Sequence, residues 1–159
     1  MLAINTFQAF ADRWIATEDR VPLPLSRLAQ LEDALGVTLP ATYKSFLMTV
    51  GPVLVPIALL DSIVDQRLDV TDVQEFYGVE TAVSVTRDWR RNGLPDEFYA
   101  IACDCMGNQY CLPIQDPGEE MVDNPNVWFF DHEEGEAYDL DVQFSDWIQR
   151  YADIESTER

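Results

Sequence analysis

The sequence predicts a single α+β domain in which N-terminal helices pack on a mostly antiparallel sheet and a C-terminal helix closes the fold. Helical periodicity dominates the first half of the chain, whereas short aromatic and β-branched runs with turn signals dominate the second half. The chain has 159 residues, 47% of them hydrophobic, which suits one domain with a real core. We expect this domain to span residues 1–152, and we expect the polar tail over residues 153–159 to fray.

Five segments predict helices because apolar residues recur in them every three or four positions: residues 7–15, 25–35, 40–50, 79–89 and 144–151. Asn5 or Thr6 is the expected N-cap of the first helix, and Asp141 that of the last. Gly36 and Gly51 stand where glycine ends the second and third helices. The N-terminal half is therefore expected to be largely helical.

Strands are predicted at residues 98–105, 109–114, 126–132 and 137–140, with a short edge strand at residues 52–60 interrupted by Pro56. The first two flank Met106-Gly107-Asn108, a strong hairpin signal. Along the strand at 126–132, alternation should place Trp128 and Phe130 on one face and Phe129 on the other. We expect these rings to belong to the core, with contact to a partner as the alternative.

Three cysteines, Cys103, Cys105 and Cys111, do not suit a secreted disulfide scaffold, because their number is odd and their density low. They also lack the Cys-x-x-Cys spacing of zinc and redox sites, so buried thiols in a sheet are expected. Two hairpin registers remain open. A two-residue turn pairs Cys111 with Asp104, and a three-residue turn pairs it with Cys103.

The compartment is predicted from what the sequence lacks. Its N-terminus has no basic segment typical of a secretory signal, and its longest apolar run, at residues 53–60, is far shorter than the roughly 20 residues of a spanning helix. We therefore expect a soluble, cytoplasmic protein that does not enter membranes.

The charge distribution carries the functional prediction. The net charge is −19, and the stretch between Arg91 and Arg150 holds fourteen acids without one Lys or Arg. The same stretch is rich in aromatic residues, so it is expected to fold. One-signed charge destabilises a compact fold, and the usual compensating gain is fast capture of a partner of opposite charge. Nucleic-acid and anionic-membrane binding are not expected, because both require basic patches. A protein that mimics nucleic acid remains an open alternative, because carboxylates can imitate phosphates.

Two runs of acids are the candidate partner-binding residues: Asp116, Glu119, Glu120 and Asp123 in one loop, and Asp131, Glu133, Glu134 and Glu136 in the next. If the loops lie at one end of the sheet, they form a single electronegative patch, and the sequence alone leaves that adjacency open. The alternative is that each acid only belongs to a solvent-exposed face and binds no partner. A merely solubilising surface mixes both signs of charge, which favours the binding hypothesis.

Two motifs invite catalytic hypotheses. Asp131-His132-Glu133 suggests a metal site or a hydrolase, but on a continuous strand His132 points away from the two acids. His132 is also the only histidine of the chain, so a structural role is expected for it. Gly107-Asn108 suggests a phosphate loop, but no lysine or following helix supports that function.

Several short motifs follow one another along the chain: Leu31-Glu32-Asp33-Ala34-Leu35-Gly36, Leu39-Pro40, Tyr43-Lys44-Ser45-Phe46-Leu47, Leu94-Pro95, Asp104-Cys105-Met106-Gly107-Asn108, Val127 to Glu133, and Phe144-Ser145-Asp146-Trp147-Ile148. In this order, over residues 25–152, they resemble the SUKH superfamily. The chain departs from the family pattern at Val50, where many members have Asn, and in its acidic loop at residues 116–125.

The resemblance implies a conserved α+β fold without a catalytic centre. Many bacterial SUKH proteins are immunity proteins that neutralise polymorphic toxins, often nucleases, and fungal members are regulatory interaction proteins. The acidity favours the first role, because nuclease toxins are commonly basic. We therefore expect a non-enzymatic monomer or homodimer, without cofactor or metal, that neutralises a basic toxin domain by electrostatically steered occlusion. The alternative is a regulatory or scaffold protein with a host partner.

Overall fold

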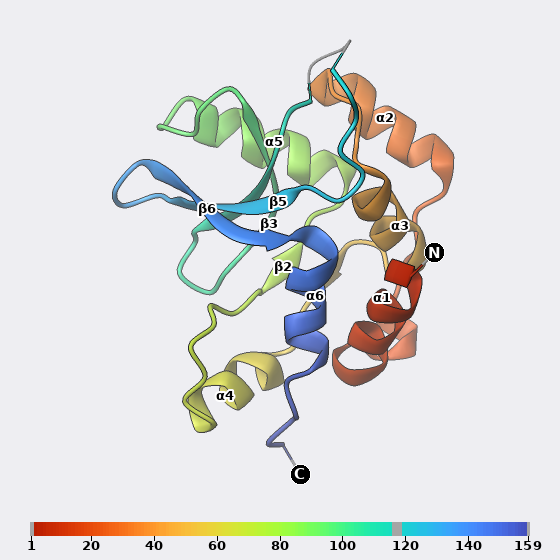
Figure 1. Cartoon of the computed structure of the whole chain (residues 1–159), viewed down its shortest axis with the longest axis vertical. Helices are drawn as coiled ribbons and strands as arrows, with labels where there is room; N and C mark the ends of the chain where they lie inside the picture. The colour runs from red at the N-terminus through yellow and green to blue at the C-terminus, as the bar shows by residue number, and fades with distance from the viewer. Residues whose placement is uncertain (1, 116–118, 159) are drawn as a thin grey trace.

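The computed structural model describes residues 2–115 and 119–158, which form an α+β domain around one antiparallel sheet, as the sequence predicts (Figure 1). The helices of these residues are α1 (Leu2–Trp14), α2 (Leu25–Leu35), α3 (Ala41–Thr49), α4 (Ile57–Asp65), α5 (Val79–Arg90) and α6 (Phe144–Ala152), with a 3-10 turn at Thr17–Asp19. The strands are β1 (Val53–Leu54), β2 (Glu75–Phe76), β3 (Phe98–Cys103), β4 (Gln109–Pro113), β5 (Asn126–Asp131) and β6 (Glu136–Gln143).

The sheet is a meander, because its spatial order β1-β2-β3-β4-β5-β6 is the order of the chain and every neighbouring pair is antiparallel. In such a sheet successive connections alternate between the two ends. The β3–β4 and β5–β6 turns therefore share one end, and the β4–β5 loop lies at the other.

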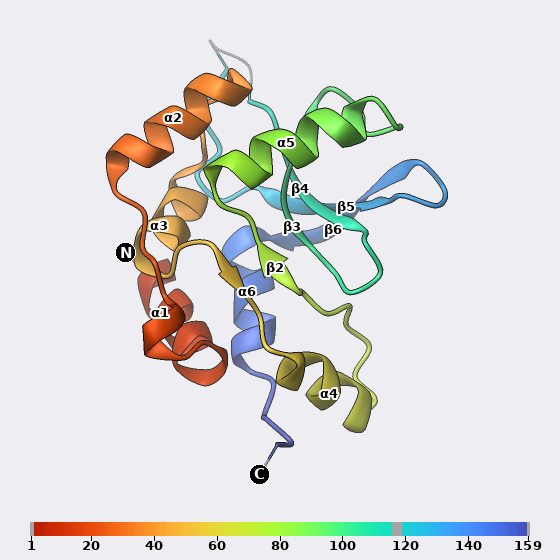
Figure 2. The same ribbon diagram turned by 180° about the vertical axis from the view of Figure 1, so that it is seen from behind.

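Helices cover both faces of the sheet. Figure 1 shows α6 in front of one face with α1 and α3 beside it, and Figure 2 shows α5 and α2 over the opposite face. On the first face, the ring of Trp147 lies 4.7 Å from that of Tyr110. On the second, Trp89 of α5 packs edge-on against Phe130 at 5.7 Å. Phe129 contacts Tyr110 on the α6 side, so the aromatic strand alternates between the two covered faces as predicted.

Several element ends differ from prediction. Helix α1 already begins at Leu2, ahead of the expected caps Asn5 and Thr6. Strand β6 continues to Gln143, which is itself the N-cap of α6 in place of Asp141. Asp141 instead has a left-handed backbone (φ 54°) where the pairing with β5 shifts register. A strand can run farther than its alternating pattern when such an irregularity absorbs the extra residues.

The expected edge strand at residues 52–60 is mostly wrong. Only Val53–Leu54 pairs as β1, and Pro56 is the N-cap of helix α4. A proline suits the start of a helix because its φ is already helical and it lacks an N–H that would go unpaired there. A continuous apolar run does not distinguish helix from strand by its periodicity, which explains the error.

Both expected hairpin registers are also wrong. Cys103 pairs with Gln109 and Cys111 with Ala100, so the connection contains five residues and the register shifts beside Ala100. The carboxylate of Asp104 explains the longer turn, because its Oδ1 accepts the backbone N–H groups of Met106 and Asn108, each at 2.9 Å. Such side-chain acceptors stabilise turns that backbone bonds alone do not.

The segment after α6 lies along α4. Ile154 is buried in the core, and the backbone N–H of Thr157 donates to Ser62 Oγ at 3.0 Å. Gln66 Nε2 donates to the carbonyl of Glu155 at 2.7 Å. These bonds attach α4 to the end of the chain.

In residues 2–115 and 119–158, no helix is both long and apolar enough to cross a membrane.

Candidate functional site

The β5–β6 turn is built around the carboxylate of Asp131. Its Oδ1 accepts the backbone N–H groups of Glu133 at 2.9 Å and Glu134 at 3.1 Å, and its carbonyl accepts the N–H of Gly135 at 2.8 Å. Gly135 adopts a φ of 70°, the left-handed conformation that glycine reaches without strain. Asp131 therefore shapes the turn, and the side chains of Glu133 and Glu134 extend from it into solvent.

His132 joins this turn to the neighbouring β3–β4 turn. Its Nδ1 lies 2.8 Å from Asn108 Oδ1, and its ring packs 5.6 Å from that of Trp89. Asn108 in turn donates from Nδ2 to Asp104 Oδ2 at 3.1 Å. The ring nitrogen that faces the protein is thus engaged in a structural contact.

Asp131, His132 and Glu133 do not converge on a common point, because the strand ends at Asp131 and the next residues form the turn. Across the described parts of the chain, no group of three or more His, Cys, Asp or Glu side chains is placed to hold a metal ion. Asp131 instead shapes the β5–β6 turn, and His132 links that turn to the β3–β4 turn.

Tyr138 lies among the carboxylates of the hairpin. Its hydroxyl lies within hydrogen-bond distance of the carboxylates of Glu134 and, at 3.0 Å, Glu136, between which its single proton is shared. These hydrogen bonds, Glu134 first, raise the pKa of Tyr138, because ionisation would place a further negative charge beside two carboxylates. The hairpin therefore presents an exposed aromatic ring bordered by acids, and tyrosine is enriched at protein interfaces.

The β4–β5 loop carries the other candidate acids. Asp116 lies outside the described residues, whereas Glu119, Glu120 and Asp123 are exposed. The end of the loop is anchored to α3, because the carbonyl of Asp123 accepts both the backbone N–H and the hydroxyl of Thr42, at 3.0 and 2.8 Å. These acids project from a segment that is bonded to the body of the protein.

The anchoring continues beside Met121 and Val122, whose side chains are exposed. Gln115 brackets Val122 by donating to its carbonyl at 2.9 Å and accepting its N–H at 2.5 Å. Asn124 bonds Ser145 at the start of α6. The loop therefore offers two apolar side chains between exposed acids.

The structure does not bring the two acidic runs together. Strand β5 separates them, with Asn126 at the loop end and Asp131 at the turn end. Five steps of an antiparallel strand span about 17 Å. In Figure 1 the turn lies at the left of the sheet and the loop at the top, next to α2. They form two acidic surfaces: the hairpin surface (Asp131, Glu133, Glu134, Glu136) and the loop surface (Glu119, Glu120, Asp123).

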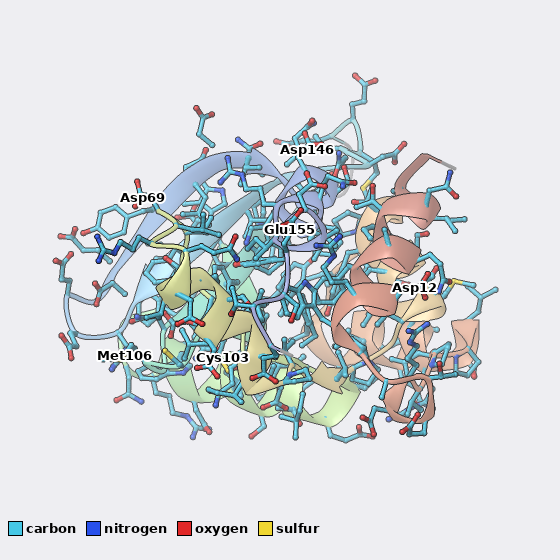
Figure 3. All side chains as sticks on the ribbon, turned by 90° about the horizontal axis from the view of Figure 1, so that it is seen from below. Asp12, Asp69, Cys103, Met106, Asp146 and Glu155 are labelled. Atoms are coloured by element: carbon cyan, nitrogen blue, oxygen red, sulfur yellow. The ribbon has the colours of Figure 1, made fainter. Side chains whose placement is uncertain are left out.

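Neither surface is neutralised by ion pairs within the described residues. The four pairs found there join Arg20 to Asp12, Arg27 to Glu80, Lys44 to Glu32, and Arg91 to Asp88. All four acids precede the basic-free stretch. Further acids lie elsewhere: Figure 3, seen from below, labels Asp12, Asp69, Asp146 and Glu155, which come from four different segments. The negative field is therefore broad, and the hairpin and the loop contribute to it without a compensating cation.

The comparison with known families tests the resemblance. The model of the SMI1 / KNR4 family (SUKH-1) matches residues 22–150. This range begins before α2 and ends inside α6, so it includes both acidic surfaces. The chain belongs to the SMI1 / KNR4 family. Membership confirms the SUKH superfamily assignment made from the motifs, and SMI1 / KNR4 domains are generally non-catalytic and often act as immunity proteins. No curated protein matches the chain significantly.

Sequence reasoning missed two features of the structure. One is the contact between Asn108 and His132, which depends on two turns meeting in space and leaves no signal along the chain. The other is helix α4, whose signal was present: Ile57, Leu60 and Val64 recur at helical spacing after Pro56.

Proposed function

We propose that this member of the SMI1 / KNR4 family is an immunity-type inhibitor that neutralises a basic toxin domain, with a nuclease as the favoured class. The observation that carries the proposal is the joint presence of this family's fold and of acidic surfaces that no Lys or Arg among the described residues neutralises. The inhibitor acts by occupying the active site of the toxin or a surface beside it. It supplies no catalytic group of its own.

Electrostatic steering supports this proposal in physical terms. A net charge of −19 attracts a basic partner over distances longer than direct contact, and steering of this kind raises association rates tenfold or more at low salt. At physiological salt the Debye length is about 8 Å, so the effect weakens as ionic strength rises. Charge on its own gives little residence time, which comes from a few apolar contacts such as Tyr138 or Met121.

One partner is large enough to contact both acidic surfaces. A standard interface buries about 800 Å² per partner, which corresponds to a disc roughly 30 Å across. The strand between the surfaces spans about 17 Å. The eight acids first singled out, including Asp116, therefore remain the proposed contact residues, with Asp131 also holding its turn.

The first experiment identifies the partner. The tagged protein is used to capture binding proteins from its source organism at about 50 mM and about 500 mM salt, ionic strengths on either side of effective charge screening. We expect a basic effector domain at low salt and much less of it at high salt. Recovery of partners that are equally retained at both salts contradicts the proposal.

The second experiment assigns the biological role. The basic protein is expressed in host cells with and without this chain. Rescue of growth by the chain supports the immunity role. A partner that harms no cells, yet binds the chain tightly, supports the alternative of a regulatory interaction module and refutes the immunity role.

The third experiment tests the surfaces separately. Glu133→Gln, Glu134→Gln and Glu136→Gln together remove the free charges of the hairpin, and Glu119→Gln with Glu120→Gln removes two from the loop. We expect each set to slow association several-fold and to flatten its salt dependence. An association rate unchanged by both sets eliminates these surfaces.

A further inference from the structure

Helix α4 presents an apolar stripe to solvent. Ile57 and Val64 are each 64% exposed, and Leu60 lies between them on the same side at the i, i+3, i+7 spacing of one helical face. The opposite side of the helix is buried through Leu59 and Ile63. A surface helix normally turns charged or polar residues outward, so the outward stripe is unexpected.

The position of α4 makes the stripe accessible. Figures 1 and 2, taken from opposite sides, both show α4 at the lower end of the molecule, below the end of α6. The end of the chain approaches α4 from another direction, where Thr157 bonds Ser62 and Asp65. No described part of the chain covers the exposed side chains of the stripe.

A small hollow adjoins the stripe. It has a volume of about 80 Å³ and is lined by Pro56, Ile57 and Leu60 on the α4 side. Asp72, Val73 and Cys105 line it from the facing segment and the β3–β4 turn. Such a hollow admits the tip of one aliphatic side chain, and side chains that fill well-packed, desolvated pockets contribute much of the binding energy at an interface.

The charge around the stripe indicates what binds there. Asp61 and Asp65 stand on α4 itself, and Asp69 follows the helix in the chain. Between Lys44 and Arg87, Arg67 is the sole basic residue of the sequence. Two copies of this chain would bring like-charged rims together, which costs free energy and disfavours self-association. An apolar centre with an acidic rim is complementary to an apolar protrusion with a basic rim.

We infer that α4 and its hollow, which we call the α4 surface (Pro56, Ile57, Leu60, Val64 and Cys105), form the anchoring surface for a basic protein. The partner inserts an aliphatic side chain beside Leu60 and places Lys or Arg next to Asp61. This inference rests on the proposed function, because it names where the basic partner gains residence time. It differs from the proposed function in locating that anchor outside the two acidic surfaces.

Photo-crosslinking tests the location. Val64→p-benzoylphenylalanine is compared with the same replacement at Val21, which is 58% exposed but distant in the chain, and at Glu133 on the hairpin surface. The cells are those in which the unmodified protein captures a salt-sensitive basic partner. We expect Val64 to crosslink to that partner and Val21 not to.

Each other outcome is decisive. A crosslink from Val64 to a second copy of the chain overturns the inference in favour of a homodimer. Crosslinks from Glu133 with none from Val64 overturn the inference and leave the proposed function standing. If the unmodified protein captures no basic partner under any salt, the proposed function fails, and the inference fails with it.

Affinity provides a second measurement. Ile57→Ser with Val64→Ser removes the stripe, and Val21→Ser with Leu25→Ser removes two aliphatic side chains of similar exposure as a matched control. We expect the stripe variant to bind the purified basic partner at least tenfold more weakly, through faster dissociation and with an unchanged salt dependence. The control should stay within twofold of the unmodified protein. A stripe variant that also stays within twofold refutes the inference.

Discussion

Asp104 is expected to hold the two turns at one end of the sheet, and its removal is the sharpest test of how this end is built. The residue is only 2% exposed, yet its carboxylate has three partners: the N–H groups of Met106 and Asn108 at 2.9 Å and the side-chain amide of Asn108 at 3.1 Å. Asn108 then contacts His132, so a change at Asp104 reaches the β5–β6 turn.

The magnitude follows from these contacts. A hydrogen bond to a charged group contributes about 1.5–3 kcal/mol to stability. The net loss in Asp104→Ala is smaller than the sum over three such bonds, because the variant is also relieved of the cost of burying a charge. We therefore expect the free energy of unfolding to fall by about 3 kcal/mol. For a domain of this size that corresponds to a drop in Tm of roughly 6–12 °C.

The assay is urea unfolding followed by the fluorescence of the four tryptophans, of which Trp89 packs against His132 at this end of the sheet. Asp131→Ala is the matched control, because its carboxylate also accepts two backbone N–H groups but lies in an exposed turn. We expect the control to lose about 1 kcal/mol. If Asp104→Ala costs no more than Asp131→Ala, the buried network does not stabilise the turns as argued.

Three further predictions concern the core and the thiols. Thr86→Val should lower the free energy of unfolding in urea by about 2 kcal/mol, because the buried N–H of Ala100 loses the hydroxyl that accepts it at 2.9 Å. A decrease below about 0.5 kcal/mol contradicts this prediction. Gly51→Ala should lower the free energy of unfolding by more than about 3 kcal/mol or prevent folding. A Cβ at this position would lie 2.0 Å from the carbonyl oxygen of Val21, and φ is 86°. Near-native stability of the variant would contradict this prediction. Desolvation, together with the neighbouring carboxylates of Asp72 and Asp104, raises the pKa of the Cys105 thiol to about 11 although the residue is exposed. Its alkylation should therefore be slow at pH 7 and accelerate about tenfold per pH unit up to that value, and a plateau near pH 8 refutes the shift.

Much of the fold could be predicted because its signals are local. The stripes that became α2, α3 and α6 depend on residues three and four positions apart, and the aromatic alternation of β5 on residues two apart. The prediction failed where two local signals conflict. At residues 57–64 six of eight side chains are apolar, so the helical spacing of Ile57, Leu60 and Val64 stands among other apolar residues and distinguishes helix from strand only weakly.

The candidate site was predicted less completely than the fold. The acids of the hairpin and the loop were recognised by their charge, which composition reveals directly. The sequence left open whether the two acidic loops lie side by side, because that depends on the number of strands between them. One strand places Asp123 and Asp131 at opposite ends of the sheet, and a hairpin turn of a different length would not have changed that.

The sequence by itself determined the family, the class of fold, the negative charge and the alternation of the β5 aromatic residues between two faces. These properties depend on composition or on neighbours within a few positions. Only the tertiary structure decided the register of Cys111, the contact between Asn108 and His132, and the exposure of Ile57 and Val64 on α4. Those features arise from segments that are distant along the chain and meet in space, and their free energy is shared among many weak contacts that no single motif records.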